Sequence, residues 1–590
     1  MVDQTIAVPV RDRVSLWRQS ATVKLAGWLI VATAIATFLG QLALSNAVWT
    51  PVGYVDVWAL WDRYMKFDAG AISLDHYLLD PFVHPHLIVF LLYLADIGLA
   101  GGRQIVPHLA MLASIVAFSA ALIYALWRTA LGERWHAFGL SVLAGTVLLT
   151  SAGISEATTI PFQTVVECSR TIYLLLLLLI IWSLHHGKQA VYIVSMAIAV
   201  ASVPFYASGN IFALEIIIVH LLPPVRWRLV ALSFLPFVAY LALVHYYMSS
   251  LTPDLASIPK VLETADLSTV WEIILSTAAY YACFLVAGWP FPMQDAMDLS
   301  MITLLMAGSA ICVWSGLWTL WTLWCAFRAR GESKARRVTD IFMAMMSLWV
   351  FISAVGASLL WEARILKLNM YNGTMSPHYA SLTSTRYSVY ASLALIVVLY
   401  SLWQVRRTWA MVAMLPIFVV VEILSFRSVT DPNWTDRIAS RDALNVAGAG
   451  ILTGIDLTDQ RVSAAGPLND WYWGQELPKV VIYLEQKDLA FARGLPQIGA
   501  SVGDKVLRAT IQITPSTSGG KLCDFTGPKV PAPSTLLAAL FGMPRRLVAV
   551  ADDRNVVVGY GAITASGVRG YARCDADKPS LVLPLKRWHE

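Results

Sequence analysis

The sequence predicts a mainly α-helical, polytopic membrane protein that ends in a small β-rich domain. Of the 590 residues, 57% are hydrophobic and 14% are charged, which is too apolar a balance for a soluble protein of this length. Several apolar runs reach the length of about 17–25 residues that a membrane helix needs. From about Asp431 the hydropathy falls, and Gly, Pro, Ser and Asp become frequent. We therefore expect a transmembrane domain at residues 25–425 and a separate domain at residues 426–590.

The N-terminal segment, residues 1–24, is basic and carries three Arg and one Lys. No small-residue cleavage site follows the first apolar run, residues 25–47, so we expect this run to remain as a span and not to be removed as a signal peptide. Basic residues flank membrane spans on the cytoplasmic side. The N-terminus is therefore expected to be cytoplasmic.

Basic clusters between the later apolar runs set the expected topology, because the positive-inside rule places all of them in the cytoplasm. This requires that two apolar runs, residues 87–101 and 271–289, lie on the outer face as juxtamembrane helices. The first is short and contains Asp96, and the second ends in Trp-Pro-Phe-Pro. The basic clusters are residues 127–134, 185–188, 225–228, 327–337 and 404–407.

About eleven spans result, with the C-terminal domain outside. Residues 191–222 must form a hairpin, because basic clusters flank both of its ends, and Pro204 and Gly209 break the helix at its turn. The expected spans are residues 25–47, 105–126, 137–149, 173–182, 191–205, 211–222, 229–247, 301–325, 341–360, 388–402 and 410–423.

The tail contains short apolar runs that predict strands separated by Gly or Pro turns. Cys523 and Cys574 are its two cysteines. An outward domain meets an oxidising compartment, so we expect either a disulfide between them or two free, buried thiols. The expected strands are residues 480–484, 509–514, 546–550 and 556–560, with an isolated helix at residues 535–541.

Several functional classes are excluded. The basic clusters are short connectors without a face of base-stacking aromatics, so nucleic acid is not an expected partner. The sequence has no Cys-x-x-Cys zinc spacing and no convincing P-loop, Rossmann fingerprint or Gly-x-Ser-x-Gly motif. The expected partners are therefore the lipid bilayer and a substrate that reaches it.

The outer loop after the first span, residues 53–70, holds the strongest candidate for chemistry. It places Asp56 a few residues after the span and beside Trp58. A carboxylate that aromatic rings shield from water can accept a proton from a substrate hydroxyl. Alternatively, Asp56 is a solvated acid in the interfacial aromatic belt.

Other polar residues of the outer face are weaker candidates for a role in catalysis or in metal binding. Asp62 and Asp68 are expected to form surface pairs with the Arg and Lys of the same loop. His84 and His86 could share a divalent cation with a nearby carboxylate, or they cap a helix or bond the backbone.

Acids also lie in the next outer loop and within the bundle. Glu156 and Glu167 bracket that loop, with Gln163 between them. Carboxylates close to the membrane interior are costly and tend to be functional. Glu215 lies within a span, and we expect it to pair with a polar neighbour.

Basic and aromatic residues precede the span at residues 388–402. Arg386 can hold a phosphate bidentately while Tyr387 lies among the lipid headgroups, or Arg386 extends along the apolar surface to reach water. Arg364 and Lys367 are further candidates for anionic headgroups.

The order of these segments resembles the C-type (GT-C) membrane glycosyltransferases, particularly bacterial proteins similar to aminoarabinose and protein mannosyl transferases. In that family an acid directly follows the first span, where this chain has Asp56 in Y-V-D-V-W. The resemblance covers residues 25–425 and not the tail. A single Asp stands where many relatives have an acidic pair, and Pro85 replaces an acid. Further similar segments are V-H-P-H-L-I-V-F with His86 and Phe90, P-F-Q at residues 161–163, S-G-N at residues 208–210 and T-R-Y at residues 385–387.

The resemblance implies an enzyme of the bacterial inner membrane that moves a sugar from a polyprenyl-phosphate donor to a hydroxyl of a glycan, lipid or protein acceptor. The reaction would take place at the outer face and invert the anomeric carbon, with Asp56 as general base. The leaving phosphate needs charge stabilisation more than a strong acid. Two alternatives stay open: a transporter or lipid flippase for an envelope precursor, and a non-catalytic envelope assembly protein. The substrate-binding residues would be Arg386, Tyr387, Arg364, His86, Gln163 and Glu156.

Overall fold

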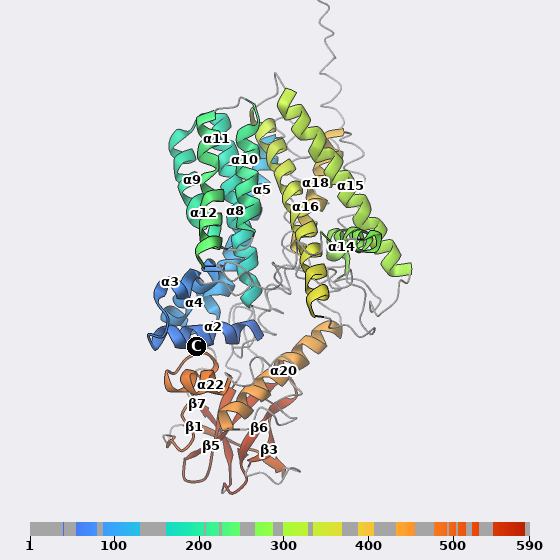
Figure 1. Ribbon diagram of the computed structural model, residues 1–590. Helices are drawn as coiled ribbons and strands as arrows, with labels where there is room; N and C mark the ends of the chain where they lie inside the picture. The colour runs from blue at the N-terminus through green and yellow to red at the C-terminus, as the bar shows by residue number, and fades with distance from the viewer. Residues whose placement is uncertain are drawn as a thin grey trace, which may run out of the picture.

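The computed structural model of the chain is mostly helical and ends in an antiparallel sheet. Figure 1 shows a bundle of long helices, a layer of shorter helices at one end of the bundle, and the sheet beyond that layer. The structure describes residues 39, 55–79, 86–129, 161–205, 208–223, 227–247, 263, 266–286, 299–328, 334–368, 388–405, 432–454, 477–492, 495–502, 506–514, 522–529, 547–576 and 578–584.

The bundle packs around one large apolar core. Tyr173 is fully buried there; its ring stacks on Phe212 with 4.7 Å between centroids and lies 5.8 Å from Trp349. Aromatic pairs of this kind add to the stabilisation that burial gives. The helices of the bundle are α5 (Ile105–Thr129), α8 (Pro161–His186), α9 (Gln189–Ser202), α10 (Gly209–Leu221), α11 (Trp227–Ser233), α12 (Leu235–Tyr247), α14 (Leu267–Val286), α15 (Leu299–Arg328), α16 (Lys334–Leu368) and α18 (Ser388–Val405).

Polar contacts fix the relative directions of the bundle helices. The Tyr400 hydroxyl donates to Oδ1 of Asp340 at 2.6 Å, so the C-terminal end of α18 lies beside the N-terminal end of α16. Thr339 donates to the carbonyl of Ala125 at 3.4 Å, which brings the C-terminal end of α5 to the same place. The two helices therefore run antiparallel, and the longer helix α16 extends beyond the N-terminal end of α18 towards the opposite end of the bundle.

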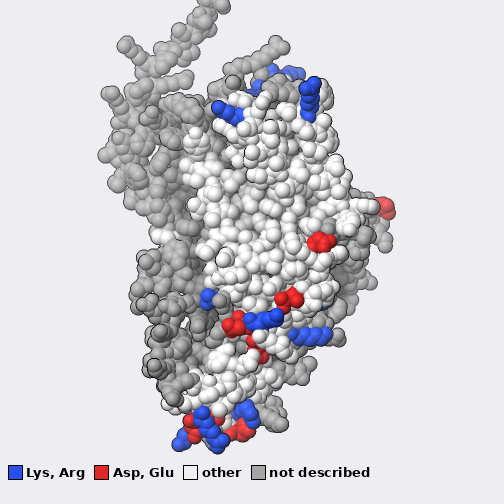
Figure 2. Space-filling model, turned by 90° about the vertical axis from the view of Figure 1, so that its left-hand side faces the viewer, with Lys and Arg blue, Asp and Glu red and all other residues white. Residues whose placement is uncertain are grey.

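One end of the bundle is basic. Arg337 donates to the carbonyls of Ala326 at 3.0 Å and Pro223 at 2.6 Å, and so covers acceptors at the ends of α15 and α10. Figure 2 shows Lys and Arg side chains at this end, then a broad belt without charged side chains on the described part of that face, and mixed charges below. The described basic residues near these helix ends are Lys188, Arg228, Arg328, Arg336 and Arg337.

The expected count of about eleven spans is not reached among the described residues. Three helical segments there are long and apolar enough to cross a membrane: Cys168–His186, Ile302–Arg328 and Arg336–Leu359. Several helices at the expected spans are too short to cross a membrane on their own. For example, α9 and α10 have 14 and 13 residues, which is about 20 Å of helix, whereas the hydrocarbon core is about 30 Å thick. The expected spans at residues 137–149 and 410–423, and all but Leu39 of residues 25–47, lie outside the described residues.

Proline accounts for two of the interruptions. The expected hairpin is present as α9 and α10, and a 3-10 turn at Val203–Phe205 that contains Pro204 ends its first arm. The run at residues 229–247 is split at Phe234 into α11 and α12, because Pro236 has no backbone N–H to continue the hydrogen bonding of α11.

The two apolar runs that were expected not to span form the helices α4 (Leu87–Ala100) and α14. Neither is among the three long apolar segments. Figure 1 shows α14 almost end-on while α8, α15 and α16 run lengthwise, so α14 crosses the direction of the bundle.

The sheet of the tail closes on itself. The strand pairs in the described part of the tail are all antiparallel, in the order β1-β7-β4-β5-β6-β3-β2. Ile511 alone separates β1 from β2, although these strands form the two edges of the sheet, so the edges are joined through one residue and the sheet forms a barrel. The strands are β1 (Val506–Thr510), β2 (Gln512–Thr514), β3 (Leu522–Gly527), β4 (Leu547–Ala551), β5 (Val557–Thr564), β6 (Gly567–Arg573) and β7 (Ser580–Pro584).

Cys523 on β3 and Cys574 directly after β6 form a disulfide, the first of the two alternatives expected from the sequence. The interior of the barrel contains Ile511, Phe525, Val548, Val550, Val558, Val568, Ala572 and Leu581.

Two features of the tail differ from expectation. The run at residues 480–484, expected as a strand, belongs to the helix α22 (Leu477–Gln486). It buries Val480, Val481 and Leu484 while Ile482 is 54% exposed, which is the spacing of a helix face and not of a strand. A long helix, α20 (Pro432–Thr453), precedes it and was not expected. The helix predicted at residues 535–541 lies outside the described residues.

Candidate functional site

The segment expected as an outer loop is largely the helix α2 (Val55–Asp68). Its buried residues Val57, Leu60 and Trp61 are spaced at i, i+3 and i+4, so they form one helix face. Figure 1 shows α2 crossing the end of the bundle that faces the tail, opposite the basic end. Because α3 (Leu74–Leu79) follows α2 at the outer edge of the molecule, the first turn of α2, which contains Asp56, is directed towards the middle.

Two of the other predicted site residues belong to helix ends near this level, those of α8 and α16. Gln163 lies in the first turn of α8, Arg364 in the last turns of α16, and Arg386 and Tyr387 directly precede α18. The side chains of Asp56, Gln163 and Arg364, and the whole of Glu156, Arg386 and Tyr387, lie outside what the structure describes.

His86 is the N-cap residue of α4 and is buried, and its side chain makes no capping hydrogen bond. His84 lies outside the described residues. The described residues contain no group of three or more His, Cys, Asp or Glu side chains that could hold a metal ion. The divalent cation stays a prediction of the sequence.

The two further acids of α2 have different partners. Asp62 pairs with Lys66 one turn along the helix at 2.7 Å, as expected. Asp68 pairs instead with the tail: Oδ2 accepts a hydrogen bond from the Tyr483 hydroxyl at 3.0 Å and lies 2.8 Å from Nζ of Lys487. The hydrogen bond from Lys487 lowers the pKa of Asp68, and burial together with Asp68 raises the pKa of Tyr483.

The aromatic residues of this segment form packing contacts between α2, α3, α4 and α22. Phe67 stacks on Tyr77 with 4.9 Å between centroids, and Tyr77 lies 5.3 Å from Phe90. Tyr64 meets Tyr483 edge-on at 6.3 Å. These rings therefore join the helical layer to the tail, where the sequence predicted an aromatic belt at the membrane surface.

The turn between α4 and α5 is built around Asp96, which is fully buried. Its Oδ2 accepts from the backbone N–H of Gln104 at 2.6 Å, and its Oδ1 accepts from that of Val106 at 2.8 Å. Burial raises the pKa of Asp96 although these N–H groups oppose the shift. The turn also contains Gly101 and Gly102, both with positive φ. Asp96 thus stabilises a turn, and the two glycines that follow it are the feature of the sequence that could have predicted this turn.

Among the described residues, the bundle buries the charged side chains of Arg170 and Glu215. Arg170 on α8 is 1% exposed and was not singled out from the sequence, because it directly precedes a long apolar run and resembles a basic residue at the end of a span. Glu215 on α10 is fully buried, and neither of its oxygens has a hydrogen-bond partner among the described residues. The expected pairing of Glu215 is therefore wrong within this part of the chain.

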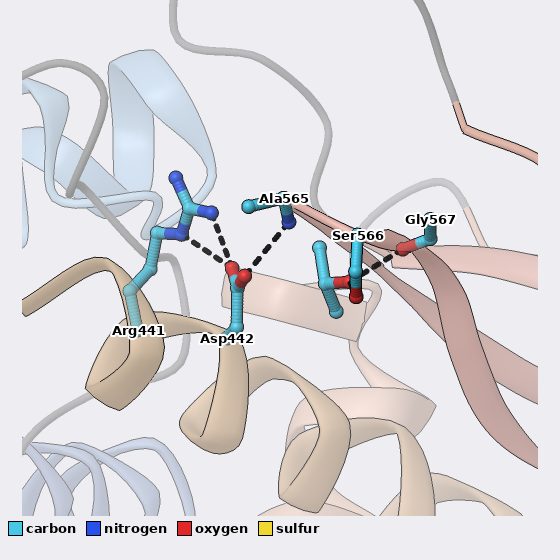
Figure 3. Close-up of polar contacts among 6 residues, drawn as sticks. Arg441, Asp442, Ala565, Ser566 and Gly567 are labelled. Carbon is cyan, nitrogen blue, oxygen red and sulfur yellow. Dashed lines mark hydrogen bonds and ion pairs between the residues drawn. The ribbon is translucent and has the colours of Figure 1, made fainter. Parts of the chain in front are cut away.

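Figure 3 shows how α20 is fastened to the barrel. Oδ2 of Asp442 accepts from the backbone N–H of Ala565 at 2.8 Å, and Oδ1 pairs with Arg441. Thr564 donates to the carbonyl of Gly567 at 2.6 Å and so holds the turn between β5 and β6. These contacts link the helix that leads away from the bundle to one turn of the barrel.

Comparison with known proteins gives no match: no family model, no curated protein and no solved structure matches this chain.

Proposed function

We propose that this protein is a GT-C-like membrane glycosyltransferase that uses a polyprenyl-phosphate sugar at the outer face of a bacterial inner membrane. One observation carries the proposal: the first turn of α2, the first turn of α8 and the last turns of α16, which contain Asp56, Gln163 and Arg364, lie at the end of the bundle opposite the basic end. The positive-inside rule makes the basic end cytoplasmic. These helix ends, the barrel and the C-terminus are then outside.

The full span count of about eleven belongs to this proposal. Three segments are long enough to cross the membrane on their own. The other spans would be formed by the shorter apolar helices and by residues outside the described ranges. The uncharged belt in Figure 2 supports a membrane at this level of the bundle.

In the proposed reaction, the acceptor hydroxyl attacks the anomeric carbon of the donor and gives its proton to Asp56. A bond forms between the acceptor oxygen and the anomeric carbon while the bond to the phosphate oxygen breaks. The phosphate leaves with that electron pair, and Arg386 and Arg364 stabilise its charge. Attack opposite the leaving group inverts the anomeric carbon. Tyr387, His86, Gln163 and Glu156 would surround the substrate.

The test is transfer of radiolabelled sugar from polyprenyl phosphate by the purified protein in nanodiscs. A general base contributes about 10²–10⁴-fold to the rate, so Asp56→Asn should lose at least about 100-fold. Asp62→Asn is the matched control, because Asp62 lies on the same helix and pairs with Lys66; it should stay within about twofold. Full transfer by correctly folded Asp56→Asn protein would refute the mechanism.

Glu215 favours a second candidate, a transporter or flippase for an envelope precursor. A buried carboxyl group without a described partner inside a bundle is typical of a translocation path. This candidate predicts that Glu215→Gln abolishes translocation of a labelled lipid precursor in liposomes while Asp56→Asn has no effect.

A further inference from the structure

Two contacts connect α2 to the tail segment Leu477–Ala492, which comprises α22 and the 3-10 turn Ala490–Ala492: one is direct, and the other passes through the turn after α4. One is polar and lies at the C-terminal end of α2. The other is apolar and lies seven residues earlier, at Trp61. We call this segment the seat of α2.

The polar contact is made by Asp68. Nζ of Lys487 and the hydroxyl of Tyr483 both bind Oδ2 of this carboxylate, at 2.8 and 3.0 Å. Tyr64, one turn earlier on α2, packs edge-on against Tyr483. Because Asp68 and Lys487 are 33% and 52% exposed, water and salt reach the pair, and charge substitutions there can be accommodated without burying a charge.

The apolar contact is made by Trp61, which is 2% exposed. Its indole lies against Gly102, where a side chain would overlap it. The backbone N–H of Ala490 donates to the carbonyl of Gly101 at 2.8 Å. The turn after α4 therefore lies between α2 and the seat and touches both.

Two separate contacts fix the direction of a helix, whereas a helix held by a single contact can rotate about that contact. Trp61 and Asp68 are about 10 Å apart along α2, and Asp56 lies about 7 Å beyond Trp61. A movement of 1 Å at Asp68, with Trp61 as pivot, would shift Asp56 by about 0.7 Å in the opposite direction. A misplacement of about 1 Å can slow a reaction about 100-fold.

We propose that the seat positions α2 for catalysis and that Asp68, Lys487 and Trp61 are positioning residues for Asp56. This inference rests on the proposed function. It gives the tail a part in the reaction: the tail would set the direction of the helix that carries the base, although no tail residue need touch the substrate.

The experiment uses charge reversal in the full-length protein in nanodiscs. Lys487→Asp should raise hydrogen exchange of the α2 amides and lower kcat by about three- to thirtyfold with KM little changed. Asp68→Lys combined with Lys487→Asp restores the attraction and should recover both quantities. The matched control is Lys66→Asp, which breaks the pair between Lys66 and Asp62 within α2 and leaves the pair between Asp68 and Lys487 in place; it should leave kcat within about twofold.

The outcomes are separable. Faster exchange in α2 with unchanged kcat, or no recovery in the double variant, would overturn the positioning role. The proposed function has its own readout, because full transfer by Asp56→Asn would refute it whatever Lys487→Asp does to exchange.

Discussion

The contact between Trp61 and Gly102 can be tested with a pair of matched substitutions. Gly102 and Gly70 both have left-handed backbone, with φ of +78° and +70°. A β-carbon on Gly70 would meet no atom within 4 Å, whereas one on Gly102 would overlap Cη2 of Trp61 and lie 2.7 Å from its Cζ2. The two substitutions therefore carry the same backbone strain and differ in the clash with one buried ring.

The expected losses of folding stability follow from the backbone strain and from the clash with the ring of Trp61. Alanine in the left-handed region costs about 1–2 kcal/mol, and this is all that Gly70→Ala should cost. Trp61 is 2% exposed and cannot turn aside into water, so Gly102→Ala should cost about 1–3 kcal/mol more, as overpacking of a core does. A shorter ring in Trp61→Phe should relieve part of that extra loss, which makes the double variant less destabilised than the sum of its parts.

The assay is the midpoint of thermal unfolding of the purified protein, followed by intrinsic fluorescence, together with hydrogen exchange of α2. Gly102→Ala should unfold at a clearly lower temperature than Gly70→Ala and should expose α2. Equal midpoints for the two alanine variants would refute the idea that Trp61 is held against the turn at Gly102.

Two further predictions concern the tail. The pKa of Asp68 lies below its ordinary value of 3.8 because Lys487 hydrogen-bonds it. This contact therefore stabilises the fold at pH values above that ordinary value, and the stabilisation is lost as the pH falls through the lowered pKa. Hydrogen exchange of the α2 amides, corrected for intrinsic rates, should rise in acid, and a Lys487→Ala protein should lack this rise. Cys523→Ser should destabilise the barrel by about 2–4 kcal/mol, because the disulfide joins residues 51 positions apart in the sequence. A reductant should lower the midpoint of thermal unfolding of the wild type and leave that of the variant unchanged. A wild-type midpoint that does not respond to reductant would contradict this prediction.

The features that the sequence predicted best depend on local properties. Basic residues next to apolar runs predicted the charged end of the bundle, because charge and hydropathy are read residue by residue. Pro204 predicted the turn of the hairpin for the same reason, since proline ends a helix wherever it stands. The disulfide was predicted as one of two alternatives, because the tail has two cysteines and no other partner for either.

The features that were missed depend on contacts between distant parts of the chain. Tyr483 and Asp68 are 415 residues apart, and nothing in either local sequence predicts their pairing. The run at residues 480–484 is rich in residues that favour strands, but its burial against α2 follows helix spacing, and packing decided the outcome. The same packing turned the expected loop at residues 53–70 into α2 and buried the aromatic residues that were assigned to the membrane surface.

The barrel has a consequence for the order in which the tail folds. β7, the last of the described strands in chain order, pairs with both β1 and β4, so it is the strand that completes the ring. While a nascent chain still lacks it, β1 and β4 each present a row of unpaired backbone groups, which is the feature that makes sheet edges stick to other chains. The barrel therefore cannot close before β7 has emerged, and until then the tail carries two edges that can pair with other chains.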